Sequence, residues 1–314
     1  MTNSDKRLFT FGCSFTKYVW PTWATIVGQE FLEFENWGCV GAGNMFIFNA
    51  LVEASITRNI SSDDTVMIMW SSMPREDRYK NNRWLCPGNI YNQTLYSQGF
   101  VDKFADLRGF YIRDLALIHS AKMILEKIGC KYNFMSMIDI SNPWEVKKEL
   151  TDSDINDLLD QYKDTLSVFK PSVHEVIFNF DWWSRPYTSD KELKKIKKNY
   201  EEVAGIDWPS FDSMVTNDFT NVKKQILDEI FDTSKWNWKN LLHNSKRINF
   251  HPTPIEHLEY VQKVLPEINL QQSTVDIIEQ IDVLLRSVTS DTMHDQPHEL
   301  LASKLKQSPT INRW

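Results

Sequence analysis

The feature of the sequence that most constrains its fold is the run Thr65–Trp70, in which every residue after the threonine is apolar. A strand with one exposed face would alternate apolar and polar residues, whereas this run does not alternate. It therefore predicts a central strand of a parallel sheet that is covered on both faces. The shorter run Leu8–Phe11 stops at Gly12 and predicts a second buried strand.

Segments with helical spacing separate the predicted strands. We expect strands at 8–11, 34–37, 65–70, 132–140 and 173–180, and helices at 20–31, 44–58, 106–128, 151–169, 255–265 and 275–288. Strand and helix alternate in the first half of the chain, which predicts a parallel α/β sheet with right-handed crossovers. The polar, Gly- and Pro-containing stretch 75–103 is expected to be a long loop.

Composition excludes several classes of protein. The 314 residues are 42% hydrophobic and 25% charged, which excludes a disordered chain. Lys and Arg number 35 against 42 Asp and Glu, a formal charge of −7, so we expect no nucleic-acid partner. Tryptophan is unusually frequent, with 12 residues, and five of these fall within 181–240.

We expect no targeting signal in this chain. Its four cysteines are widely spaced and are expected to be reduced thiols, not a zinc site or a disulfide framework. Only five uncharged residues, Leu8–Gly12, follow the charged N-terminus, which is too short for a signal peptide. No apolar stretch approaches the ~18 residues that a transmembrane helix needs. We expect no membrane partner, and either a cytoplasmic location or, for a phage-encoded chain, association with a virion.

The first motif that bears on chemistry is Gly12-Cys13-Ser14-Phe15, directly after the first predicted strand. Ligands of open α/β sheets bind at the carboxyl ends of the strands, so Ser14 is a candidate nucleophile. The structural alternative is a serine that only caps a helix.

The second motif is the Gly-rich turn Gly38–Gly43, after the second predicted strand. Gly41 is a candidate oxyanion donor, because a glycine has no side chain to block the approach of an oxyanion to its backbone N–H. The structural alternative is a tight turn with no catalytic role. The glycines fall as G-x-x-G-x-G, which is not the dinucleotide fingerprint. No P-loop lysine follows them, so a phosphate- or nucleotide-binding function is a minor reading.

The third motif is His251-Pro252-Thr253-Pro254, just before a predicted helix. A histidine on a rigid loop suits a general base, although a structural role fits as well. His257, six residues further on, is expected to be a packing or supporting residue within the helix.

Together these motifs resemble the SGNH (GDSL-type) hydrolase family. Ser14, Gly41 and His251 match the order of the family's nucleophilic serine, oxyanion glycine and histidine, and His257 matches its trailing histidine. The resemblance extends over residues 8–265 and implies a three-layer α/β/α, flavodoxin-like parallel sheet with a helical, Trp-rich insertion. The sequence around Trp20–Trp23 and His251 also resembles that of uncharacterised family members carried by marine bacteriophages.

This chain departs from the family's sequence motifs at two places, around the serine and after the strand 65–70. Cys13 stands where the family has an Asp before the serine, and we expect a buried, inert thiol there. The stretch Trp70–Asp77 lacks the family's oxyanion asparagine. The hydroxyl of Ser72, in preference to that of Ser71, is a candidate replacement donor, and Arg75 adds positive charge.

A third departure concerns the acid of the triad. The family's acid precedes the histidine by three residues, where this chain has Ile248. Asn249 is the nearest polar residue that could orient the imidazole of His251. An amide stabilises an imidazolium less well than a carboxylate does, so a Ser–His dyad is the favoured reading, with an acid from elsewhere in the fold as the alternative.

The resemblance implies an ester hydrolase that needs no cofactor or metal. Indole faces stack on sugar rings, so the tryptophans of 181–240 suggest an O-acetylated polysaccharide or a similar acyl ester as substrate. The alternative is that these tryptophans only fill the core of the insertion. The alternative function is a weak or inactive carbohydrate-binding or structural module, for example of a phage particle, with the polar C-terminal tail as an assembly contact.

The motifs also predict the domain organisation. Ser14 and His251 belong to one site in the family plan, so residues 1–270 are expected to form one α/β domain. Insertions at about 75–103 and 181–240 interrupt it, and residues 271–314 form a C-terminal helix and tail.

Overall fold

A computed structural model describes residues 6–91, 96–141, 152–178, 251–287 and 301–311. These residues belong to a unit that comprises 1–179, 251–286 and 297–314, apart from Ser287. Residues 180–250 and 287–296 are assigned to a second unit. The predicted insertion 181–240, with its five tryptophans, therefore lies outside the described residues, and the predicted domain boundaries stay predictions.

The core of the described unit is a four-stranded parallel sheet in the order β2-β1-β3-β6. Its strands are β1 (Arg7–Gly12), β2 (Glu33–Asn36), β3 (Thr65–Trp70) and β6 (Lys131–Ser136). Every residue of β3 is buried, as the apolar run predicts, and β1 is buried from Leu8 onward. The predicted central strand is confirmed.

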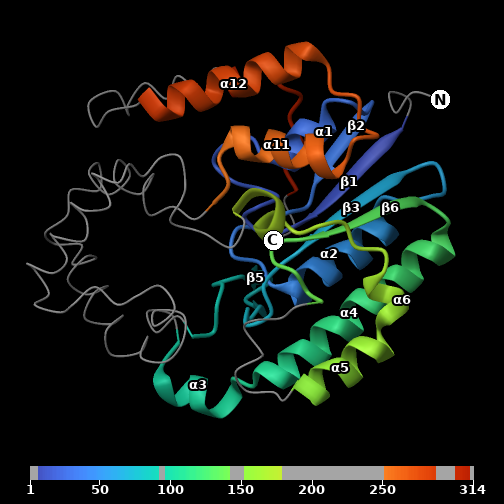
Figure 1. Ribbon diagram of the computed structural model, residues 1–314, viewed down its shortest axis with the longest axis vertical. Helices are drawn as coiled ribbons and strands as arrows, with labels where there is room; N and C mark the ends of the chain where they lie inside the picture. Colours follow the sequence, from blue (N-terminus) through green and yellow to red (C-terminus); the bar gives the residue numbers. More distant parts are fainter. Residues whose placement is uncertain (1–5, 92–95, 142–151, 179–250, 288–300, 312–314) are drawn as a thin grey trace, which may run out of the picture. The chain divides into compact units, whose positions relative to one another are not determined.

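Helices cover both faces of this sheet (Figure 1). They are α1 (Trp23–Gly28), α2 (Asn44–Thr57), α4 (Leu107–Ile128), α5 (Asp152–Gln161), α6 (Lys163–Leu166), α11 (Pro254–Val264) and α12 (Gln272–Ser287). In Figure 1, α2 and α4 lie on one face, and α1 and α11 lie on the other. The predicted three-layer α/β/α class with a parallel sheet is confirmed.

The limits of α4 follow from its capping residues. The side chain of Asp106 accepts a hydrogen bond from the Gly109 N–H at the start of the helix. Gly129 ends the helix with a φ of 76°, a left-handed conformation that glycine adopts without steric cost.

Two predicted elements are wrong. The expected strand 173–180 is instead the π-helical turn η2 (His174–Phe178). Ser172 and Glu175 exchange side-chain to backbone hydrogen bonds of 2.7 and 3.2 Å, which favours a turn of helix there. The expected loop 75–103 contains the hairpin β4 (Arg78–Lys80) and β5 (Arg83–Leu85) and the helix α3 (Gln98–Phe104).

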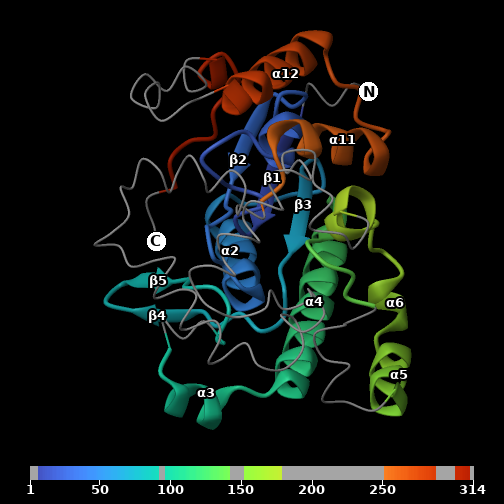
Figure 2. The ribbon, with the colours of Figure 1, turned by 60° about the vertical axis from the view of Figure 1, so that its left-hand side comes forward.

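The hairpin forms because two asparagines make its turn. Asn81 and Asn82 have φ values of 54° and 59°, as a type I′ turn requires. The hairpin stands apart from the main sheet (Figure 2). Trp84 of β5 contacts Phe46 of α2, with ring centroids 5.7 Å apart. This segment is therefore anchored beside the start of α2.

The described end of the chain lies along the outer strand β2. The Asn36 N–H donates to the hydroxyl of Ser308 over 2.7 Å, and the Lys306 N–H donates to the side chain of Gln29 over the same distance. Leu305 and Ile311 are buried. Residues 301–311 thus cover part of a sheet edge. An assembly contact made by the tail stays a prediction.

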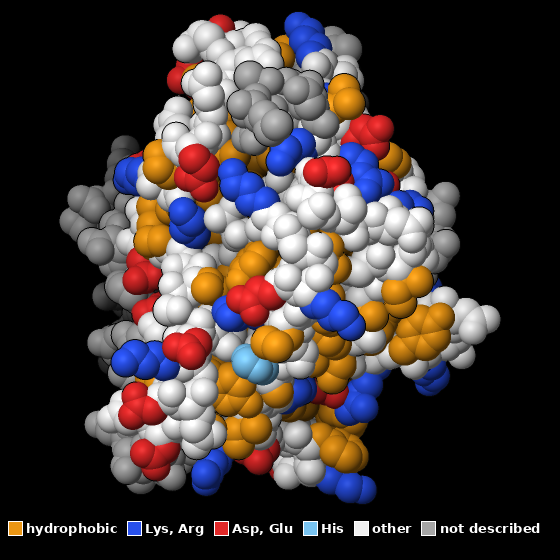
Figure 3. Space-filling view, turned by 90° about the vertical axis from the view of Figure 1, so that its right-hand side faces the viewer, with side chains coloured by type: hydrophobic (Ala, Val, Ile, Leu, Met, Phe, Trp, Pro, Cys, Tyr) orange, Lys and Arg blue, Asp and Glu red, His pale blue; other side chains and the backbone are white. Residues whose placement is uncertain are grey.

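The face of the molecule in Figure 3 carries acidic, basic and apolar side chains side by side. Acidic and basic side chains alternate over this view, with apolar patches between them. The described residues seen from this side therefore present no continuous basic stripe of the kind that nucleic-acid binding uses.

Candidate functional site

The candidate site lies where the strand order of the sheet reverses. β1 is flanked by β2 on one side and β3 on the other, so the segments that follow β1 and β3 leave the sheet toward different helices. Open α/β sheets bind ligands at such a switch point. Ser14 follows β1 and Ser72 follows β3, which brings two of the predicted site residues to this edge.

A tight turn after β1 presents Ser14. A Cβ on Gly12 would lie 2.0 Å from Thr16 Oγ1 and 2.9 Å from the Met69 carbonyl, so only glycine fits there. The N–H groups of Thr16 and Lys17 both donate to the Cys13 carbonyl, at 2.9 and 3.1 Å. Ser14 is 3% exposed at the start of this turn.

Two side chains fix the far end of the same turn. The Thr16 carbonyl accepts hydrogen bonds from Asn36 Nδ2 at 2.8 Å and from Thr22 Oγ1 at 2.6 Å. Asn36 is the last residue of β2, so its amide ties the turn that carries Ser14 to the neighbouring strand. Cys13 is fully buried.

The Gly-rich turn after β2 lies against both neighbouring loops. The Cys39 N–H donates to the Gly12 carbonyl over 3.0 Å, which joins this turn to the end of β1. Gly41 has a φ of 80°, and a Cβ there would lie 2.1 Å from the Cys86 carbonyl. Within the described part of the chain, the N–H groups of Ser14 and Gly41 donate to no acceptor. Neither N–H group is therefore committed to a hydrogen bond within these residues.

Arg75 connects Ser72 to this Gly-rich turn. Its Nε donates to Ser72 Oγ over 3.3 Å, and its Nη1 donates to the Ala42 carbonyl over 3.0 Å. The Ser72 hydroxyl accepts from Arg75, so its own proton is free to be donated elsewhere. Arg75 therefore joins Ser72 to Ala42, the residue that follows Gly41.

A buried polar cluster behind these loops was missed by the sequence reasoning. Asn44 Oδ1 accepts from the Ser71 N–H at 2.8 Å, and Asn44 Nδ2 donates to the Ser71 carbonyl at 3.1 Å and to Asp114 Oδ2 at 2.6 Å. Burial raises the pKa of Asp114 to about 6, although the adjacent Arg113 lowers it. The signal that could have revealed Asp114 is its position, since it shares the apolar face of α4 with Leu115 and Ile118.

Asp77 belongs to the same cluster and caps α2. Its carboxylate accepts from the Gly43 N–H at 2.8 Å and from the Phe46 N–H at 2.9 Å, at the start of the helix. Burial raises the pKa of Asp77, while these two hydrogen bonds oppose the shift. The cap holds the segment after β3 against the Gly-rich turn.

His251 comes to the same edge from the far end of the chain. Its imidazole stacks on Tyr18, with ring centroids 4.0 Å apart and planes 16° apart, and it meets Phe15 edge-on at 5.6 Å. Trp20 Nε1 donates to the Pro252 carbonyl over 2.9 Å. The histidine therefore packs against the residues that directly follow Ser14.

The loop that carries His251 is held by the start of α11. Thr253 and Glu256 form a reciprocal capping box, with hydrogen bonds of 3.3 and 2.7 Å, and Pro254 begins the helix. His257 is 1% exposed within α11. Ile248 and Asn249 lie outside the described residues, so the predicted orienting role of Asn249 stays a prediction.

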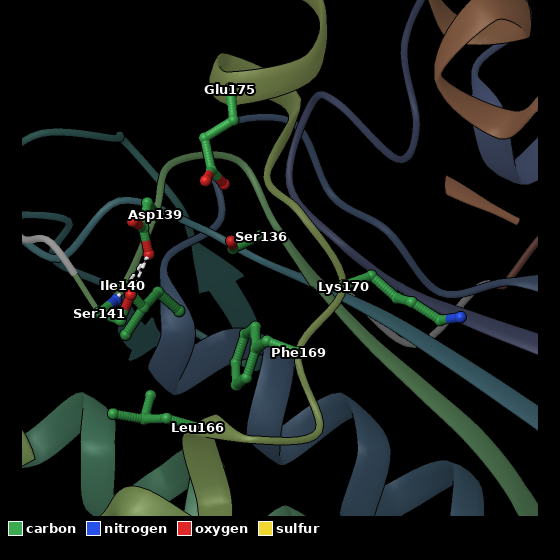
Figure 4. A pocket seen from close by; sticks show the side chains of 8 residues that line it. All are labelled: Ser136, Asp139, Ile140, Ser141, Leu166, Phe169, Lys170 and Glu175. Atoms are coloured by element: carbon green, nitrogen blue, oxygen red, sulfur yellow. Dashed lines mark hydrogen bonds between the residues drawn. The ribbon is translucent and has the colours of Figure 1, made fainter. Parts of the chain in front are cut away.

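A small pocket of about 40 Å³ lies at the carboxyl end of β6 (Figure 4). It is lined by Ser136, Asp139, Ile140, Ser141, Leu166, Phe169, Lys170 and Glu175. Asp139 is already engaged by the N–H and hydroxyl of Ser141, at 2.9 and 2.6 Å. None of the predicted site residues lines this pocket, so we do not place the chemistry there.

Two further features bear on ligands. Among the described residues, no three His, Cys, Asp or Glu side chains are grouped so that they could bind a metal ion. In the same part of the chain, no helix combines the length and apolar character needed to cross a bilayer.

Comparison with known proteins yields distant structural similarity alone. No protein-family model and no curated protein matches the chain. It is similar to a member of the lipolytic protein G-D-S-L family from Veillonella parvula, with 15% identity and a TM-score of 0.34 over 63% of this chain and 97% of that one. It is also similar to a GDSL-like lipase from Bacteroides thetaiotaomicron, with 12% identity and a TM-score of 0.30 over 55% and 70% of the two chains. Neither similarity is high enough to assign an activity, which therefore rests on the residues themselves.

Proposed function

We propose that the chain is a serine ester hydrolase in which Ser14 is the nucleophile and His251 is the general base. The contact of the His251 imidazole with the turn that Ser14 begins carries this proposal: its ring centroid lies 5.6 Å from that of Phe15, the residue next to Ser14. Stacking on Tyr18 fixes the plane of the imidazole. Approach of this oriented base to the Ser14 hydroxyl would activate the hydroxyl for attack.

The reaction proceeds in two halves. His251 takes the hydroxyl proton of Ser14 as Ser14 Oγ attacks the ester carbonyl. The N–H groups of Ser14 and Gly41 and the hydroxyl of Ser72 donate to the tetrahedral oxyanion, and the charge of Arg75 adds to its stabilisation. The protonated histidine then gives its proton to the departing alcohol, and a water molecule, deprotonated by His251, releases the acyl group.

The substrate that we propose is an O-acetylated carbohydrate or a similar acyl ester. The support is the aromatic content of the chain, which is 13% of its residues. One of these aromatic residues, Tyr79 on the hairpin beside the site, is 59% exposed. From the sequence alone, we also propose that the protein is phage-encoded and that its C-terminal tail contacts a larger assembly.

The second candidate is a binding module that has lost catalysis. The observation that favours it concerns Asn44, whose amide oxygen and nitrogen are both hydrogen-bonded to Ser71 or Asp114. Asn44 therefore does not replace the oxyanion asparagine that the segment after β3 lacks. Binding of acetylated glycans without turnover of any ester would support this candidate.

The experiment that separates the two candidates is hydrolysis of p-nitrophenyl acetate by Ser14→Ala. We expect kcat to fall by at least about 10³-fold, because the nucleophile is lost. Ser71→Ala is the matched control, since it removes a hydroxyl that is fully buried and has no hydrogen-bond partner among the described residues. Equal turnover by Ser14→Ala and the wild type would refute the proposal.

A further inference from the structure

The face of the His251 imidazole lies on the ring of Tyr18. The two ring centroids are 4.0 Å apart and the ring planes are 16° apart, so the two rings are stacked. The face of a phenol ring carries partial negative charge, because its quadrupole places electron density above and below the ring plane. A cation within about 6 Å of such a ring centroid is attracted to it. The pair therefore has the geometry of a cation–π contact whenever His251 is protonated.

A neighbouring tryptophan keeps Tyr18 in this position. Trp20 meets Tyr18 edge-on, with ring centroids 4.5 Å apart and planes 74° apart. Trp20 Nε1 donates to the carbonyl of Pro252, the residue after His251, at 2.9 Å. Tyr18, Trp20 and His251 are all half-buried, and partial exclusion of water strengthens a cation–π contact. The stack thus joins the turn that carries Ser14 to the loop that carries the histidine.

We propose that Tyr18 is the positioning residue of the general base, whose ring holds the imidazole of His251 by its face and favours the imidazolium that forms when Ser14 loses its proton. This inference rests on the proposed function. In the first step the hydroxyl proton of Ser14 passes to His251 as Ser14 Oγ bonds to the ester carbon. The proton then passes to the departing alcohol, and the imidazole is neutral again. The ring thus stabilises the charged state of the base more than the neutral one, and this difference lowers the barrier.

This role bears on the residue that precedes His251 by three positions. The hydrolases that the sequence resembles have an acid there, where this chain has Ile248. A carboxylate in that place holds the imidazole in one tautomer and stabilises the imidazolium. The face of Tyr18 supplies the second of these effects and fixes the plane of the imidazole. It does not select the tautomer, because both ring nitrogens lie in the imidazole plane, to which the stacked ring is nearly parallel.

Titration of His251, followed by NMR in the full chain, tests this inference without any need for activity. In Tyr18→Leu the midpoint should fall by roughly 0.5–1 pH unit, because leucine keeps the position apolar but removes the π face. Tyr18→Phe is the matched control, since it keeps the ring and should keep the midpoint. In the wild type, the ring signals of Tyr18 should shift with the same midpoint as His251, a measurement that needs no substitution.

Charged groups on the neighbouring elements are the same in all three proteins. They include Lys17 on the turn, Glu256 at the start of α11, and Asp282 of α12, which accepts from the Ile255 N–H at 3.4 Å. A difference in midpoint between Tyr18→Leu and Tyr18→Phe therefore reports the aromatic ring.

Hydrolysis of p-nitrophenyl acetate gives the second readout. In Tyr18→Leu, kcat/KM should fall about tenfold, because the base is both weaker and less well oriented. In Tyr18→Phe it should stay within about twofold of the wild type. The acid limb of the pH profile of kcat/KM should move to lower pH in Tyr18→Leu by the same amount as the NMR midpoint, which a purely structural defect would not produce.

Each result has a defined meaning. Equal midpoints in Tyr18→Leu and Tyr18→Phe, or Tyr18 signals in the wild type that do not follow His251, overturn the inference. A lower midpoint in Tyr18→Leu with unchanged kcat/KM overturns the role of Tyr18 in the reaction. If the wild type hydrolyses no ester, the proposed function has failed, and the titration still decides whether Tyr18 favours the imidazolium.

Discussion

Substitution of Gly41 by alanine tests the geometry of the oxyanion site. The residue has a φ of 80°, which costs a non-glycine residue about 1 kcal/mol. The new Cβ would also lie 2.1 Å from the Cys86 carbonyl, more than 1 Å inside van der Waals contact. Overpacking of this kind adds ~1–3 kcal/mol, so we expect the free energy of unfolding to fall by ~2–4 kcal/mol.

The same substitution should impair catalysis beyond its effect on stability. The turn must move by about 1 Å to relieve the clash, which carries the Gly41 N–H away from the oxyanion and lowers kcat by about 10²-fold. The assay is p-nitrophenyl acetate hydrolysis at a temperature where urea unfolding shows the variant to be folded.

Gly88→Ala is the matched control for this prediction. Gly88 has a similar φ of 93°, yet a Cβ there meets no heavy atom of the described residues within 4 Å. It should cost about 1 kcal/mol of stability and leave kcat within about twofold of the wild type. Equal kcat values for Gly41→Ala and Gly88→Ala would refute the reasoning.

Three further changes should give distinct results. Ser72→Ala should lower kcat by about 10²–10³-fold with KM little changed in steady-state assays, whereas Ser71→Ala should not. Burial raises the pKa of Asp114 from 3.8 to about 6, so its stabilising contribution is present below pH 3.8 and is lost as the pH rises through about 6. Urea unfolding should show the stability of the wild type relative to Asp114→Asn falling by ~3 kcal/mol over that window; a constant difference would contradict this. Thr253→Ala should lower thermal stability by ~1 kcal/mol in calorimetry, because it removes the cap of α11.

The strands were predictable because burial leaves a simple pattern. The uninterrupted run of β3 and the stop at Gly12 each follow from one local rule, and both hold in the structure. The segment 173–180 shows the limit of such rules. It is rich in β-branched and aromatic residues, yet hydrogen bonds between Ser172 and Glu175 favour a helical turn, and apolar periodicity does not register them.

The sequence predicts the candidate residues of the site, whose catalytic roles stay predictions, but it does not predict the contacts that support them. Ser14, Ser72 and His251 are candidates because each follows a recognisable strand or precedes a proline. The Asp77 cap on α2 joins residues 34 positions apart, and the hydrogen bond between Asn44 and Asp114 joins residues 70 positions apart. Such contacts depend on how loops pack, which no local pattern encodes.

The most direct test of the account is covalent labelling of the active chain by a fluorophosphonate probe. Activated serines react with such probes, so we expect one adduct per chain, mapped by peptide mass analysis to Ser14. Labelling should slow by about 10²-fold or more in His251→Asn, because the general base is lost. An adduct on Cys13, an adduct on another serine, or equal rates in the two proteins would contradict the assignment of Ser14 and His251.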